Sequence, residues 1–148
     1  MVGQNLSRQY SEVHMASMSS EETVLMLYDG VIRFLREAGE EIGRKSISSK
    51  VRLLEKVERI IEYLRSCLDR ENGGEIAENL NRLYEYMLLR LTEANLYNDT
   101  AKLGEIERLI ATLREGWVTI CDAAKKGQES PLQNEEGQAT PKKIVVSI

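Results

Sequence analysis

Few side chains in this chain are suited to catalysis or metal binding. Its one histidine is His14, and no glutamate stands three residues before it. A carboxylate-bridged metal pair in a helical bundle needs two Glu-x-x-His motifs. The two cysteines, Cys67 and Cys121, lack the ligand spacing of a zinc site. Glycine-rich phosphate-binding loops are missing from the sequence. We therefore expect no enzymatic activity, no metal and no cofactor.

The two cysteines each occupy an apolar position of a helical pattern. A free cysteine behaves as a small buried hydrophobe, and thiols stay reduced in the cytosol. We expect two free thiols. A disulfide stays open as an alternative, because it would require the two helices to meet at these positions.

The chemistry that remains is apolar. A bundle helix needs one apolar stripe, but three of the expected helices carry a second one. These additional residues are Leu25, Tyr28 and Ile32, then Leu53, Ile60 and Cys67, then Ala77, Tyr84, Leu88 and Leu91. One interpretation is ordinary packing, since each helix of a bundle touches two neighbours. The other is a set of grooves for an amphipathic helix from a partner.

Tyrosine dominates the aromatic residues, with six Tyr against one Phe and one Trp. Its apolar ring and polar hydroxyl suit a surface that is sometimes wet and sometimes covered. This composition favours the groove interpretation, although any single tyrosine is equally compatible with the boundary of the bundle. The six are Tyr10, Tyr28, Tyr63, Tyr84, Tyr86 and Tyr97.

Four helices are expected to position these residues, over 20–43, 49–70, 75–97 and 100–126. Ser20 and Asp99 are the candidate caps for the first and the fourth, and Asn72-Gly73-Gly74 is the expected break between the second and the third. The predicted inner stripe of the first helix consists of Val24, Leu27, Val31, Leu35, Ala38 and Ile42. The second has Val51, Leu54, Val57, Ile61, Leu64 and Leu68, and the third has Ile76, Leu80, Leu83, Met87 and Ala94. The fourth has Leu103, Ile106, Ile110, Leu113, Trp117 and Ile120.

Short connections between consecutive helices force them to run antiparallel. We therefore expect an all-α fold: an antiparallel up-down four-helix bundle over 20–126, with an N-terminal arm (1–19) and a C-terminal tail (127–148). The tail ends in Lys-Lys-Ile-Val-Val-Ser-Ile at 142–148. That apolar end could dock on the bundle, on a partner or on another copy.

Charge and hydropathy restrict the class of partner. The 148 residues carry a net charge of −4, with acidic and basic side chains interleaved. This pattern argues against a nucleic-acid surface, which needs clustered positive charge. No apolar run approaches the ~20 residues that span a bilayer, and residues 1–9 do not resemble a secretory signal. We expect a cytoplasmic protein without membrane insertion.

Five segments, in order, resemble the FliS family of flagellar secretion chaperones. Residues 25–35 (LMLYDGVIRFL) closely match its LMLYDG-x-I-R-F-L signature. The other matches are GGEIA-x-x-L at 73–80, LY-x-Y at 83–86, L-x-x-AN at 91–95 and LREGW at 113–117. Two positions depart from the pattern: residues 17–20 lack the usual proline, and Thr23 replaces an apolar residue.

The resemblance implies a helical chaperone that binds the disordered C-terminal segment of flagellin one-to-one. It also implies a second partner, the flagellar export apparatus. The family's N-terminal tyrosine corresponds to Tyr10, and we expect the arm to cover part of the groove when cargo is absent. Together, pattern and resemblance give these candidate partner-binding residues: Tyr10, Leu25, Tyr28, Leu53, Ile60, Tyr63, Tyr84, Leu88, Leu91 and Asn95. The alternative function is a self-associating helical structural or regulatory module.

Overall fold

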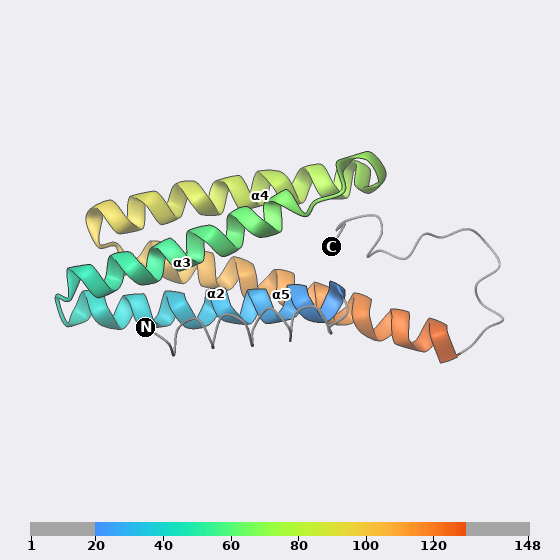
Figure 1. Cartoon of the computed structure of the whole chain (residues 1–148), viewed down its shortest axis with the longest axis horizontal. Helices are drawn as coiled ribbons and strands as arrows, with labels where there is room; N and C mark the ends of the chain where they lie inside the picture. The colour runs from blue at the N-terminus through green and yellow to red at the C-terminus, as the bar shows by residue number, and fades with distance from the viewer. Residues whose placement is uncertain (1–19, 130–148) are drawn as a thin grey trace, which may run out of the picture.

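Four long helices make up the described part of the chain. The computed structural model describes residues 20–129, with side chains through Asp122. The helices are α2 (Ser20–Gly43), α3 (Ile47–Ser66), α4 (Arg70–Tyr97) and α5 (Thr100–Glu129). They form the expected antiparallel up-down bundle (Figure 1). Residues 1–19 and 130–148, which include Tyr10 and His14, lie outside the description, so the predicted arm and tail stay predictions.

The helices form a ring in which each packs against two neighbours. Both α2 and α4 lie between α3 and α5, and α2 makes the closer contacts with them. The shared core is built mainly from apolar side chains with little exposure, among them Val31, Leu54, Val57, Ile61, Met87, Ile106 and Ile110. Within residues 20–122 every buried side-chain nitrogen and oxygen has a hydrogen-bond partner. Cys67 and Cys121 are not joined in a disulfide; Cys67 is buried, as expected, whereas Cys121 is half-buried.

The α2 helix has the bounds that the sequence predicts. Glu21 and Glu22 lie in its first turn, where their charge opposes the helix dipole. Its predicted stripe is largely buried, with Val31 and Ala38 fully inside and Leu35 2% exposed. A regular spacing of apolar residues on one face is therefore sufficient to fix this helix.

The connection between α3 and α4 lies earlier than predicted. The α3 helix ends at Ser66 instead of residue 70, and α4 begins at Arg70. Asp69 caps α4 by accepting a hydrogen bond from the Asn72 backbone N–H at 3.1 Å. Hydrogen bonds from the Asn72 side chain and backbone lower the pKa of Asp69. The expected break is thus inside α4, at Gly74, whose φ of 52° and ψ of −132° interrupt the helical geometry.

The buried face of α4 matches the predicted one only in part. Met87 and Ala94 are fully buried, as predicted. Ile76, placed inside by the sequence pattern, is 57% exposed, whereas Ala77 and Tyr84 are buried. Asn81 is also buried on this face. The Asn81 Oδ1 accepts hydrogen bonds from Arg65 at 2.9 Å and Arg70 at 2.7 Å. Apolar periodicity cannot anticipate a buried polar side chain that is satisfied by distant residues.

The turn between α4 and α5 is as predicted. Asn98 adopts a left-handed conformation with φ 52° and ends α4. Asp99 then caps α5, because its Oδ1 accepts hydrogen bonds from the backbone N–H groups of Ala101 and Lys102 at 3.1 and 3.3 Å. The α5 helix continues to Glu129 instead of ending at residue 126.

Candidate partner-binding surface

Three of the predicted surface residues lie in the core. Tyr28 and Tyr84 are each 2% exposed and Leu91 is 4% exposed. The Tyr28 and Tyr84 hydroxyls share a buried hydrogen bond of 2.7 Å. We therefore remove these three residues from the candidate surface in this conformation. A tyrosine hydroxyl is tolerated inside a bundle when a second one reaches it from the facing helix.

The same burial changes the acidity of this pair. Removal from water raises the pKa of Tyr84 strongly, and its proximity to Tyr28 adds to the effect. Burial also raises the pKa of Tyr28, against a smaller opposing effect of its hydrogen bond to Tyr84. Both hydroxyls are thus neutral at any physiological pH, and they serve to join α2 to α4 through the core.

A second group of predicted residues lies where α3 meets α2. A Cβ added to Gly30 of α2 would lie 3.6 Å from the Ile60 Cδ1, so the helices approach closely here. Leu53 and Ile60 are half-buried against the core, and they lie seven residues apart on one side of α3. Tyr63, one turn beyond Ile60, is 41% exposed. Burial raises the pKa of Tyr63, and a hydrogen bond with the Cys67 thiol adds to this effect.

Phe34 extends this side of the molecule, and the sequence analysis missed it as a surface residue. It is half-buried, and the side chains of Arg33 and Lys56 lie over its ring at 4.9 and 5.2 Å. The signal that the sequence offered for Phe34 was that it is the chain's one phenylalanine. We call Phe34, Leu53, Ile60 and Tyr63 the α2–α3 groove. At the Gly43 end of α2 the same seam holds a depression of about 370 Å³, lined by Glu37, Glu40, Glu41, Arg44, Ser49, Arg52, Leu53 and Lys56. Of the four groove residues only Leu53 lines this depression, and its other lining residues are charged or polar.

The remaining predicted residues lie at other seams. The backbone carbonyl of Asn95 accepts a hydrogen bond from Lys50 Nζ at 2.9 Å, across the contact of α3 with α4. Leu88 is half-buried. It lies three residues after Glu85, whose carboxylate pairs with Arg65 of α3. Leu25 lies one turn before Asp29, which pairs with Arg114 of α5. The candidate residues therefore do not form one continuous patch.

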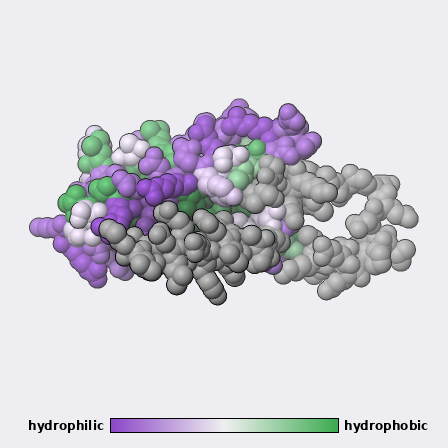
Figure 2. Space-filling view, in the orientation of Figure 1, coloured by the Kyte–Doolittle hydropathy of each residue, from purple (hydrophilic) through white to green (hydrophobic). Residues whose placement is uncertain are grey.

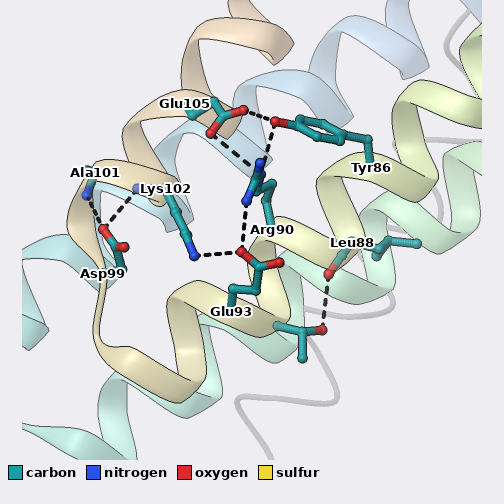
Figure 3. A network of polar contacts seen from close by, with 9 residues as sticks. Tyr86, Leu88, Arg90, Glu93, Asp99, Ala101, Lys102 and Glu105 are labelled. Carbon is teal, nitrogen blue, oxygen red and sulfur yellow. Dashed lines mark hydrogen bonds and ion pairs between the residues drawn. The ribbon is translucent and has the colours of Figure 1, made fainter.

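The seam between α4 and α5 is closed by a polar network (Figure 3). The Tyr86 hydroxyl donates to Glu105. Arg90 donates to the Tyr86 hydroxyl at 2.9 Å and to Glu93 at 2.8 Å, and Lys102 Nζ donates to Glu93 at 2.6 Å. The hydrogen bonds from Lys102 and Arg90 both lower the pKa of Glu93, and the one from Lys102 has the larger effect. This side of α4 is thus occupied by polar contacts.

The outer edge of α4 is apolar. Leu89 is 58% exposed, and Leu96 and Tyr97 are each 70% exposed. Figure 2 shows hydrophobic side chains standing out along α4 toward its C-terminal end. We call Leu89, Leu96 and Tyr97 the exposed α4 edge. The predicted stripes did not include it.

Two other kinds of site were searched for within the described residues. In that part of the chain no three His, Cys, Asp or Glu side chains gather as potential metal ligands. None of the four helices there is long and apolar enough to cross a bilayer.

Comparison with known proteins identifies the family. The family model described as "Flagellar protein FliS" matches residues 3–124. The flagellar secretion chaperone FliSB of Pseudomonas aeruginosa is 38% identical over 121 residues, which cover 79% of this chain and 96% of that protein. The flagellar secretion chaperone FliS of Salmonella typhimurium is 38% identical over 109 residues, with 73% and 81% covered.

A solved structure agrees with the fold. The crystal structure of a bacterial flagellar chaperone superposes with a TM-score of 0.68 at 18% identity, covering 79% of this chain and 98% of that one. The family model and the curated relatives span most of the bundle, as do the five motifs found in the sequence. This chain therefore belongs to the FliS family of flagellar proteins.

Proposed function

We propose that this chain is a cytoplasmic export chaperone that binds the disordered C-terminal segment of flagellin one-to-one. Binding prevents premature polymerisation and keeps the cargo competent for flagellar type III secretion. The relatives named as flagellar secretion chaperones support the chaperone role. The partner and the mode of binding rest on the physical arguments that follow.

The observation that carries the proposal is the α2–α3 groove. Leu53 and Ile60 lie two helical turns apart, about 10.5 Å along the axis. An amphipathic helix presents anchors with the same repeat, at i, i+3, i+4 and i+7. Covering these half-buried side chains would remove their remaining apolar area from water, while the hydroxyl of Tyr63 can stay hydrated at the rim.

One groove is too small to hold the cargo alone. Coupled folding and binding of a disordered segment buries roughly 1,000–3,000 Å² and loses several kcal/mol to ordering. We therefore expect the flagellin segment to continue over neighbouring seams. Leu25, on the α5 side of α2, and Leu88 and Asn95, between α3 and α4, are the candidates for these further contacts.

The N-terminal arm belongs to the same proposal. Tyr10 lies outside the described residues, and we expect the arm to cover part of the groove until cargo replaces it. Amide exchange measured with and without a flagellin C-terminal peptide tests this idea. Protection within residues 1–18 should fall when the peptide binds, and unchanged protection would refute the covering role.

Delivery requires a second interaction. The chaperone–flagellin complex has to be recognised by the flagellar export apparatus, and we propose this as the second partner. The competing function is a self-associating helical module, which the exposed α4 edge favours. Sedimentation separates the two: a module of that kind forms a concentration-dependent oligomer that a flagellin peptide does not dissociate.

Titration calorimetry with a flagellin C-terminal peptide tests the main proposal. We expect a one-to-one complex, a negative heat-capacity change and a gain of helix by circular dichroism. Leu53→Asp and Ile60→Asp should weaken binding. Tyr63→Asp provides a more exposed site in case either change impairs folding. Ile47→Asp, at a 50% exposed position of the same helix, is the matched control. If the groove variants bind as tightly as this control, the groove assignment is wrong.

A further inference from the structure

The exposed α4 edge is a linear apolar surface. Leu89 and Leu96 are seven residues apart, so they lie on one line along α4, about 10.5 Å from each other. The neighbouring helices contact α4 from its two sides, through Glu85 toward α3 and Glu93 toward α5. The edge between these sides faces outward, and large apolar side chains exposed in this way are available for a contact.

Acidic residues precede this edge on the same line of α4. Glu85 and Glu78 have side chains that are each 48% exposed. Each already pairs with one arginine, Arg65 and Arg82 respectively. A carboxylate has acceptor sites for further donors, so both can still receive a lysine. A matching ligand would carry positive charge first and apolar residues afterwards, in the direction of α4.

Residues 142–148 of this chain have that order. Lys142 and Lys143 precede Ile144-Val145-Val146-Ser147-Ile148. The β-branched residues favour an extended conformation, in which Ile144, Val146 and Ile148 share one face. Ile144 and Ile148 would then lie about 13 Å apart, close to the separation of Leu89 and Leu96.

The chain between α5 and this segment is long enough. Because α5 runs antiparallel to α4, the end of α5 and the beginning of α4 lie toward the same end of the bundle (Figure 1). The axial distance from Glu129 back to the level of Leu89 is about 33 Å at the rise of an α-helix. The fourteen residues 130–143 can span up to ~46 Å. A segment that reached α4 in this way would approach from the acidic side, with its lysines near Glu85 and its apolar residues over Leu89 and Leu96.

We propose that residues 142–148 dock on the exposed α4 edge of their own molecule as an extended strap. The tether raises the local concentration of the segment to the order of millimolar, so a contact that is weak between separate molecules is populated within one. The α2–α3 groove lies on other helices, so the strap is tested without cargo. Leu88 and Asn95, the candidates for further flagellin contacts, neighbour Leu89 and Leu96 on α4.

Methyl NMR of the 148-residue chain, compared with a variant truncated after Pro141, tests the strap. We expect the Leu89 and Leu96 methyl resonances to shift on truncation, and those of Ile76, exposed on the same helix, to stay in place. Leu89→Glu combined with Leu96→Glu should move the Ile144 and Ile148 resonances in the full chain, whereas Ile76→Glu should not. A peptide of residues 142–148 should restore the shifts in the truncated variant with a Kd on the order of 1 mM.

Three results would overturn the proposal. The Leu89 and Leu96 resonances could be unchanged by truncation. The differences could disappear on dilution, which would assign the contact to a second copy of the chain. They could also occur at Leu53 and Ile60 instead, which would place the segment in the α2–α3 groove.

Discussion

The α2 and α4 helices lie opposite each other in the ring but are held in different ways. The inner face of α2 is a regular apolar stripe, with Val31 and Ala38 fully buried. The α4 helix has a break at Gly74, a polar Asn81 in its core face and an apolar edge in water. The α2 helix thus belongs to the closely packed half of the bundle, whereas α4 depends on specific polar contacts and retains apolar surface.

The largest expected difference concerns apolar truncation on the two helices. Leu35→Ala removes a side chain that is 2% exposed and should lower the free energy of unfolding by about 2–5 kcal/mol. Leu89→Ala, at a 58% exposed position, should change it by about 0.5 kcal/mol or less. Urea unfolding of both variants measures this contrast. Equal losses would mean that Leu89 is packed as tightly as Leu35, which would contradict an exposed α4 edge.

The hydroxyl pair that joins the two helices gives the next effect. Tyr84→Phe leaves the buried Tyr28 hydroxyl without its 2.7 Å partner and should cost about 1–3 kcal/mol of stability. The double variant Tyr28→Phe/Tyr84→Phe should lose less than the sum of the single changes, because no unsatisfied hydroxyl remains. A double-mutant cycle in urea measures the coupling, and strict additivity would exclude the hydrogen bond as a stabilising contact.

Glycine replacement should have opposite signs on the two helices. Gly74→Ala on α4 should destabilise the protein by about 1–3 kcal/mol, since a φ of 52° with ψ of −132° strains any residue with a Cβ. On α2, a Cβ at Gly39 meets nothing within 4 Å, so Gly39→Ala should stabilise by about 0.5–1 kcal/mol. Thermal unfolding of the two variants tests both signs, and a stabilised Gly74→Ala would contradict the break in α4.

The smallest effect involves the polar network of α4 with α5. Because hydrogen bonds from Lys102 and Arg90 lower the pKa of Glu93, its contribution to stability is complete above the ordinary glutamate pKa of about 4.3. The contribution is lost as the pH falls through the lowered pKa of the folded state. NMR titration of the Glu93 carboxyl, with Lys102→Met as the comparison, measures the shift. A Glu93 pKa that Lys102→Met leaves unchanged would remove the lysine from the network.

The sequence predicted the parts that depend on local chemistry. Regular spacing defined α2, and Asp99 was identified as the cap of α5. Its failures arose from contacts between distant residues. Tyr28 and Tyr84 were expected at the surface because nothing local shows that their hydroxyls meet. The face of α4 was predicted only in part, and its buried Asn81 is satisfied by arginines outside its own turn. The second stripe on α3 located Leu53 and Ile60 at a seam, but periodicity alone could not separate that seam from the core.

Methyl NMR during titration with the flagellin C-terminal segment tests the central claim most directly. We expect the Leu53 and Ile60 methyl resonances to shift until one equivalent is bound, while those of Ile47, exposed on the same helix, stay in place. Binding that shifts only Leu89 and Leu96, or no binding at all, would contradict a partner groove between α2 and α3.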